Sequence, residues 1–351
     1  MRQKYVTLQV AATYMGAVIG AGFASGQELV YFFVRYKNAG FLGLGLTGVL
    51  FALLGMLTIK MVNHFEVGSY TELITKTMGR GVGRALDIWL TIFLFVGLCI
   101  MLAGSAAVFV EHLKAPFWVG LLLTVVCLLS ALLAGGEGIL LFNTCLMPLL
   151  LIITLIVSFS AVGQEAAVNG EFLAMDAVNT GLLGESWLLA SVLYVSYNMI
   201  IGVVVLTSIP LELRRNSLWG GMLGGLALGF LGLVMAWALG YYYPQVLAYE
   251  IPMLFVAGQV NPLLKLPYTM ALWFAMLTTA LANAFSLAQR MSGGGRDYHR
   301  TVLVILALAL PFAGLSFAQM VTNIYPLFGY IGLFVILLIF VSGFIKYLKQ
   351  L

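Results

Sequence analysis

Charge is scarce in this sequence. Of its 351 residues, 9% are charged and 62% are hydrophobic, and the mean hydropathy is +1.06. Charged side chains make up about 25% of an average soluble domain, because a soluble fold must present a polar surface to water. The shortage of charge therefore excludes a soluble globular fold and indicates that lipid is the solvent for most of the surface.

Cysteine and histidine are scarce too, with three residues of each. Cys99, Cys127 and Cys145 lie in apolar segments without CxxC spacing, which favours buried small side chains over disulfides or a metal site. The histidines are far apart, so a metal cluster is not expected. No basic stretch is interleaved with aromatics, so the net charge of +4 indicates membrane topology rather than nucleic-acid binding.

Long apolar runs recur along the whole chain. A helix needs about 20 apolar residues to cross about 30 Å of hydrocarbon. The ten predicted spans are 6–34, 39–62, 84–112, 116–134, 138–161, 186–210, 217–240, 266–291, 300–317 and 321–346. We therefore expect one all-α transmembrane domain over 1–351. The N-terminus has no small-residue cleavage pattern, so we expect a retained first helix rather than a signal peptide.

The distribution of Lys and Arg predicts the orientation in the plasma membrane. With a cytoplasmic N-terminus, four basic residues fall outside, namely Arg35, Lys37, Lys114 and Lys265. The other thirteen fall inside, at positions 2, 4, 60, 76, 80, 84, 214, 215, 290, 296, 300, 346 and 349. This bias follows the positive-inside rule and predicts that both termini are cytoplasmic. The outside segment 162–185 carries four carboxylates and no Lys or Arg.

The two halves of the chain have the same order of spans and connections. In both 6–161 and 186–346, two spans are followed by a long connection and then by three more spans. The long connections are 63–83 and 241–265. Because each half has an odd number of spans, the second copy is inverted in the membrane. Inverted repeats are typical of transporters, since they provide two similar states with access from opposite sides.

The first and sixth spans carry polar or glycine-rich interruptions at corresponding positions. The first holds Gly16–Gly22 followed by a polar patch that ends in Gln27 and Glu28, and the sixth holds Ser196–Gly202. Such pairs predict broken helices around a midplane site, where helix-end amides bind a carboxylate and free carbonyls bind a cation or an amine. The alternative for the first span is a close packing face of small residues.

The predicted site suits a small zwitterion such as a neutral amino acid, because no basic side chain lies near it. Its predicted residues are Ala17, Val18, Gly20, Ala21, Gly22, Cys99, Tyr197, Asn198 and Gly202. The spans contain no HExxH motif, no paired acidic motif and no Ser/His pairing, so an enzyme is not expected. A small-molecule substrate and the bilayer are the expected partners, and the oligomeric state stays open.

The run GAVIGAGFASGQE, at 16–28, resembles the YkvI-type membrane proteins of the amino acid–polyamine–organocation superfamily. That resemblance implies the five-plus-five LeuT fold and secondary active transport by alternating access. It also implies a sodium site made by the carbonyls of Gly16 and Ile19 with Ala275, Thr278 and Thr279 of the eighth span. The alternative is that both Thr hydroxyls bond carbonyls of their own helix.

The same resemblance narrows the coupling chemistry. Proton-coupled relatives may carry a Lys in the fifth helix, and metal-transporting relatives carry an acidic, asparagine-bearing break in the first; this sequence has neither. We therefore expect sodium as the coupling ion, no cofactor and no divalent metal substrate. A ligand sensor on the same fold is the alternative function, as is a proton-coupled carrier that uses Glu28.

Three acidic residues near the spans have predicted roles. Glu28, beside Gln27, is a candidate gate or coupling residue, or else a surface carboxylate. Asp87 is expected to pair with Arg84 or a neighbour. Asp297 is a candidate inner latch, since a salt bridge to Arg2 or Lys4 would close the cytoplasmic side.

Overall fold

A computed structural model describes residues 2–133, 137–162, 181–215, 217–292 and 297–350. The first half contains α1 (Arg2–Val18), α2 (Ala21–Ser25), α3 (Gln27–Phe32), η1 (Val34–Tyr36), α4 (Asn38–Phe65), α5 (Tyr70–Met78), α6 (Arg80–Leu113), α7 (Phe117–Leu133) and α8 (Glu137–Val162). The second contains η2 (Gly181–Leu183), α10 (Trp187–Ser208), α11 (Leu211–Arg215), α12 (Leu218–Tyr241), η3 (Gln245–Ala248), α13 (Pro252–Val260), α14 (Pro262–Ser292), α15 (Tyr298–Ala313) and α16 (Phe317–Gln350).

Long apolar helices dominate the described residues. Six of them, α4, α6, α10, α12, α14 and α16, are long and apolar enough to cross a membrane, and shorter apolar helices lie at Phe117–Leu133, Pro148–Ala161 and Tyr298–Ala313. Large apolar side chains such as Leu42, Ile88 and Phe334 stay exposed on the outer surface, as expected where lipid is the solvent. The predicted all-α multi-pass membrane fold is confirmed; the count of ten crossings stays a prediction.

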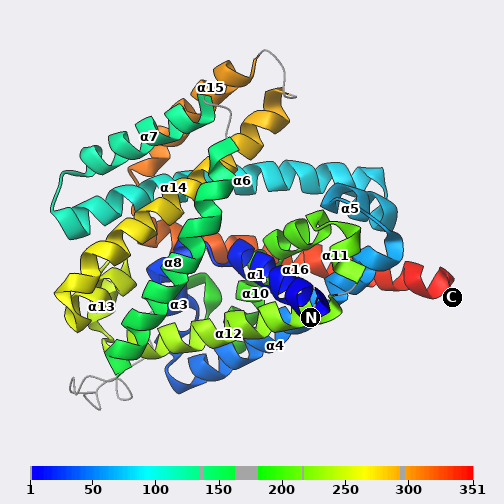
Figure 1. Ribbon diagram of the computed structural model, residues 1–351, viewed down its shortest axis with the longest axis horizontal. Helices are drawn as coiled ribbons and strands as arrows, with labels where there is room; N and C mark the ends of the chain where they lie inside the picture. Colours follow the sequence, from blue (N-terminus) through cyan, green and yellow to red (C-terminus); the bar gives the residue numbers. More distant parts are fainter. Residues whose placement is uncertain (1, 134–136, 163–180, 216, 293–296, 351) are drawn as a thin grey trace.

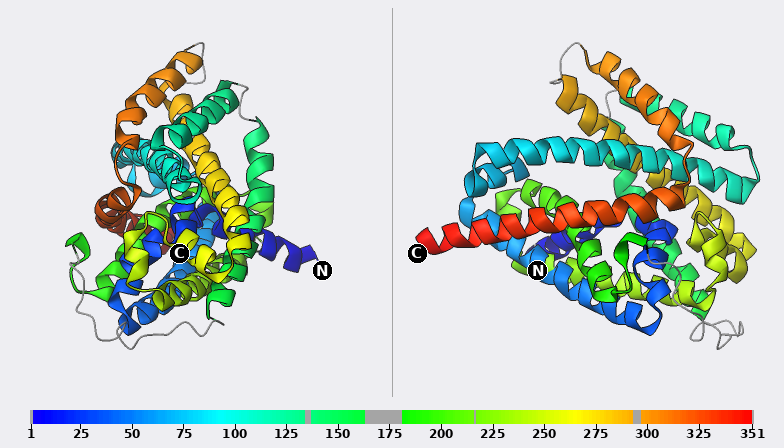
Figure 2. Two further views of the ribbon diagram at one scale, coloured as in Figure 1. Left: turned by 90° about the vertical axis from the view of Figure 1, so that its left-hand side faces the viewer. Right: turned by 180° about the vertical axis from the view of Figure 1, so that it is seen from behind.

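Corresponding helices of the two halves pack against each other. α4 lies along α12, α6 crosses α14, and α1 packs on both α10 and α12 (Figures 1 and 2). These are the second with the seventh, the third with the eighth and the first with the sixth predicted spans. Both long connections also fold into a helix, α5 in one and α13 in the other. The inverted internal repeat itself stays a prediction.

Glycines make the contact between α4 and α12 unusually close. A Cβ on Gly221 would lie 2.6 Å from the carbonyl carbon of Gly55, and one on Gly48 would lie 3.0 Å from the Cα of Gly229. The two backbones therefore touch without intervening side chains. Small residues permit this in lipid, where van der Waals packing rather than the hydrophobic effect holds helices together.

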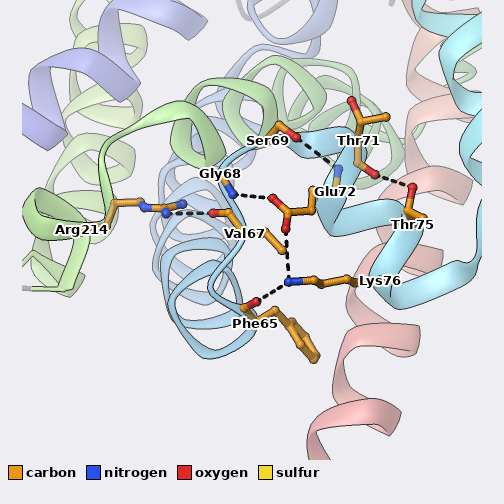
Figure 3. A network of polar contacts seen from close by, with 9 residues as sticks. All are labelled: Phe65, Val67, Gly68, Ser69, Thr71, Glu72, Thr75, Lys76 and Arg214. Carbon is orange, nitrogen blue, oxygen red and sulfur yellow. Dashed lines mark hydrogen bonds and ion pairs between the residues drawn. The ribbon is translucent and has the colours of Figure 1, made fainter.

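The connection from α4 to α5 is tied down by polar contacts (Figure 3). The guanidinium of Arg214, from α11, donates to the carbonyl of Val67 at 2.8 Å. The Glu72 carboxylate accepts from the Gly68 N–H at 2.9 Å and pairs with Lys76 at 3.2 Å, and these two contacts lower the pKa of Glu72. This network holds α5 against the ends of α4 and α10.

The sixth predicted span is not broken, which corrects the sequence-based expectation. α10 runs without interruption through Ser196 and Asn198. Its polar side chains bond the preceding turn instead: the Ser196 hydroxyl donates to the Val192 carbonyl at 2.6 Å, and the Asn198 amide donates to the Tyr194 carbonyl at 3.0 Å. These side chains are therefore satisfied inside the helix without opening its backbone.

Adding one methyl group in the α4–α12 seam should destabilise the fold. We expect Gly221→Ala to lower the free energy of unfolding by roughly 1–3 kcal/mol, since the backbones must separate to admit it. The matched control is Gly45→Ala in α4, where no neighbouring atom lies within 4 Å of the new Cβ. Thermal unfolding of the purified protein in detergent measures both variants; equal unfolding temperatures would contradict the account of the seam.

Candidate solute site at the helix break

The first predicted span is interrupted twice; the glycine run predicted one break, within 16–22, whereas the second, at Gly26, was not predicted. α1 ends at Val18 and α2 begins at Ala21, and Gly20 between them has extended backbone dihedrals, with φ −87° and ψ 178°. A second interruption separates α2 from α3 at Gly26, whose φ is +81°. Only glycine adopts that backbone conformation without strain. The break leaves backbone groups near Gly20 outside a regular helical ladder.

The two sides of the break have different surroundings. Gly16 and Gly20 are partly exposed, and no neighbouring atom lies within 4 Å of where their Cβ atoms would be. In contrast, every residue from 21 to 30 is buried. The α1 side therefore borders open space, whereas α2 and α3 are packed inside the bundle. A helix divided in this way can change its packing on one side of the break while the other side stays closed.

Glu28 is buried inside the bundle, which excludes the surface alternative. Its side chain is only 5% exposed, and its Oε2 accepts a hydrogen bond of 2.7 Å from the Tyr197 hydroxyl of α10. Its Oε1 lies against Gly22, where any Cβ would overlap it, and the Tyr325 hydroxyl of α16 lies beside the same glycine. The carboxyl group therefore links both helix breaks to α10 and α16.

Aromatic rings surround this carboxyl group. Tyr197 packs on Tyr325 with centroids 5.0 Å apart and on Tyr194 at 5.5 Å, and Phe32 contacts Tyr194 at 5.3 Å. The Tyr194 hydroxyl is buried near Glu28 without a hydrogen bond of normal geometry among the described residues. Within that part of the chain, Glu28 forms no salt bridge with Lys or Arg. The site is thus a carboxyl group in an aromatic enclosure.

The remaining predicted site residues divide into two groups. Tyr197 and Asn198 are buried on α10 near the break, as expected. Gly202, however, makes room for Tyr14 of α1, because a Cβ there would lie 2.8 Å from the Tyr14 ring. Gly202 thus has a packing role. The other predicted lining residues belong to α1, α2 and α6; Ala17 is partly exposed, and Val18, Ala21 and Cys99 are buried.

The predicted sodium ligands of α14 make helix contacts. The hydroxyls of Thr278 and Thr279 both donate to the Ala275 carbonyl, at 3.1 and 2.8 Å. This is the alternative arrangement considered from the sequence. The Ile19 N–H bonds the Met15 carbonyl at 2.8 Å and so extends α1 beyond its last helical residue. A sodium site between these groups and Gly16 stays a prediction.

The predicted latch between Asp297 and the N-terminus stays a prediction. Asp297 is exposed and precedes α15, and both views place the start of α15 far from the N-terminal end of α1 (Figures 1 and 2). The side chains of Arg2 and Lys4 lie outside the described residues. Gln27, the other predicted gate residue, is buried, and its backbone N–H bonds the Ser25 hydroxyl at 3.2 Å.

Polar contacts at the two ends of α6 were incompletely predicted. Asp87 pairs with Arg290 of α14 at 2.5 Å and accepts from the Tyr70 hydroxyl at 2.8 Å, so its partner is Arg290 rather than Arg84. At the other end, Glu111 accepts from the Glu250 N–H at 2.6 Å. The Glu250 carboxylate in turn accepts from the Ser316 hydroxyl and the Ala318 N–H at the start of α16.

Sequence reasoning missed Tyr194 and Tyr325 as site residues. A signal existed for Tyr325, because the polar run Thr322-Asn323 precedes it and Pro326 follows it within an otherwise apolar span. Tyr194 is one helical turn before Asn198, on the same face of α10. Aromatic residues are common in membrane helices, however, so neither residue could be distinguished from ordinary packing by its type.

Comparison with known proteins supports the resemblance. No family model matches the chain. It is 27% identical over 332 residues to the uncharacterized membrane protein YkvI of Bacillus subtilis, covering 93% of this chain and 92% of that one. The chain is YkvI-like over nearly its whole length. The uncharacterized protein YyaD of the same organism is 25% identical over 327 residues, with 92% of each chain covered.

Among solved structures, the chain is similar to those of a manganese transporter from Eremococcus coleocola. One mutant of that transporter matches with a TM-score of 0.48 and 15% identity, covering 96% of this chain and 86% of the transporter. A second mutant matches with a TM-score of 0.46 and 16% identity, covering 97% and 87%.

Because Gly22 contacts Glu28, we expect alanine substitution at Gly22 and at Gly16 to affect the stability of this YkvI-like protein differently. Gly22→Ala should lower the free energy of unfolding by roughly 1–3 kcal/mol, because the new methyl group displaces the buried carboxyl group. Gly16→Ala should leave it unchanged or slightly raised, since its Cβ meets open space within α1. Thermal unfolding of both variants is the measurement, and similar destabilisation by the two would refute this geometry.

Proposed function

We propose that this YkvI-like protein is a secondary transporter that moves a small solute by alternating access around the break between α1 and α2. The observation that carries this proposal is the asymmetry of the break, with open space at Gly16 and Gly20 and full burial from 21 to 30. A plain membrane anchor has no use for an interrupted helix, since each unpaired backbone group in lipid is costly. Broken helices at membrane depth are typical of solute sites.

The proposed solute is a small zwitterion such as a neutral amino acid, and the proposed coupling ion is sodium. The break offers backbone polar groups to the solute. Among the described residues around it, buried apolar and aromatic side chains lie beside Tyr197 and Asn198. Sodium would bind between the end of α1 and Thr278 and Thr279 of α14. Their hydroxyl oxygens keep lone pairs after donating to Ala275, so they can still act as ligands.

Proton coupling through Glu28 is the second candidate mechanism. It is favoured by the burial of this carboxyl group and by its hydrogen bond to Tyr197. In an enclosure without Lys or Arg, a bound proton removes the cost of a buried negative charge. Release of that proton when the bundle opens would couple its movement to that of the solute.

Counterflow separates transport from sensing and tests the coupling ion. Proteoliposomes loaded with unlabelled neutral amino acids should accumulate the labelled compounds from outside, and a sodium gradient should drive faster uptake than a potassium gradient. We expect Thr279→Val to abolish the sodium effect. Thr75→Val in α5, which also loses a hydroxyl bonded to its own helix, serves as the control. Ligand binding without counterflow would indicate a sensor instead, and uptake indifferent to sodium would refute sodium coupling.

The proton-coupled alternative makes its own prediction for Glu28. Glu28→Gln keeps the size of the side chain and can still accept a hydrogen bond from Tyr197, but it cannot exchange a proton at neutral pH. We expect proton-coupled uptake in wild type to change with external pH and uptake by Glu28→Gln to be insensitive to it. Parallel pH profiles for the two proteins would exclude Glu28 as the coupling group.

A further inference from the structure

We propose that Glu28 binds the ammonium group of the transported solute, within the enclosure formed by Phe32, Tyr194, Tyr197 and Tyr325. The inference rests on the proposed transport function and names the group of the solute that the protein recognises, which is a protonated amine. A carboxylate on the solute then contributes less to binding than the amine does.

The charge of Glu28 has no partner of opposite sign among the described residues. The side chain is 5% exposed, it forms no salt bridge there, and it accepts a hydrogen bond from the neutral Tyr197 hydroxyl. A carboxyl group at membrane depth is costly and is retained chiefly where it serves a ligand, an ion or a proton. A cationic solute group would supply the missing charge during transport.

The enclosure suits an organic ammonium group. Tyr197 is packed at 5.0 Å from Tyr325 and at 5.5 Å from Tyr194, so several ring faces and edges lie close to the carboxyl group. Ring faces attract ammonium groups, while Mg²⁺ and Ca²⁺ take six or more oxygen ligands. The Tyr194 hydroxyl, which is buried and has no hydrogen bond of normal geometry in the described part of the chain, adds an oxygen near the site.

Because α10 is continuous, it does not provide the free backbone carbonyls that the sequence predicted as acceptors for the amine. A broken sixth helix would have offered free carbonyls to the amine, but α10 is regular from Trp187 to Ser208. The Tyr194 carbonyl, which faces this region, already accepts from the Asn198 amide at 3.0 Å. In this part of the bundle the Glu28 carboxylate is therefore the strongest acceptor for an ammonium group.

The break provides a route to the carboxylate. Gly22 has no side chain to separate Glu28 from α2, and Gly20 opens onto free space two residues earlier. Gly20 and Gly26 flank the five-residue helix α2, and both lack the side chain that would restrict their dihedrals. A small rotation of α2 about these two glycines would move Gly22 away from Glu28 and so open the carboxyl group, which lies on α3, toward the break.

Binding of matched compounds to the purified full-length protein tests the proposal. Each of the neutral amino acids is compared with its decarboxylated amine and with its deaminated acid; for leucine these are 3-methylbutylamine and 4-methylpentanoate. We expect thermal stabilisation by at least one amino acid, weaker stabilisation by its amine and none by its acid. Glu28→Gln should weaken the binding of the amino acid at least tenfold, whereas Glu28→Asp and Tyr197→Phe should weaken it less.

Two controls keep the outcome interpretable. Glu185→Gln removes an exposed carboxylate outside the enclosure and should bind like wild type. An unchanged unfolding temperature of the ligand-free Glu28→Gln protein shows that the variant is folded, and Tyr197→Phe provides a second, milder perturbation if it is not. Equal binding of amino acid and deaminated acid, a loss of affinity smaller than tenfold in Glu28→Gln, or no binding of any amine-bearing probe would each overturn the proposal. Counterflow of a solute without an amine would overturn it while leaving the transporter function intact.

Discussion

In lipid, backbone and side-chain polar groups must find hydrogen-bond partners inside the protein, and this requirement governs the structure. Most of the described chain meets it in the simplest way, through uninterrupted helices. Several buried hydroxyls and amides follow the same rule by bonding the preceding turn, as Thr58, Ser196 and Asn198 do. Against this background the interruptions at Gly20 and Gly26 stand apart, because regular helix is abandoned there inside a buried segment.

Neighbouring helices support the interrupted segment around Gly20 and Gly26. The glycine seam brings α4 and α12 into direct backbone contact, and α1 packs on α10 and α12 beside it. Tyr14 fills the space that Gly202 leaves on α10, and its hydroxyl donates to the Phe51 carbonyl at 3.1 Å. The Tyr268 hydroxyl of α14 donates to the Ala24 carbonyl in α2 at 2.6 Å. Helices on several sides thus support the short segment that contains the break.

The position of Glu28 connects the break to the chemistry of transport. A carboxyl group held by a tyrosine hydroxyl and enclosed by rings is sensitive to any movement of α3 against α10 and α16. At both ends of α6, carboxylates link neighbouring helices through Asp87 with Arg290 and through Glu111 with Glu250. These contacts join neighbouring helices at both ends of α6, while the backbone of the first span is interrupted between α1 and α3.

Composition and spacing alone determined that the chain is an all-α membrane protein, because 20-residue apolar runs have no other stable environment. They also located the first-helix break, since glycines weaken a helix wherever they cluster. The tertiary structure decided what spacing could not: that α10 is continuous, that Glu28 is buried rather than at the surface, and that Asp87 pairs with Arg290. These outcomes depend on which side chains meet across helices distant in sequence, and no local pattern contains that information.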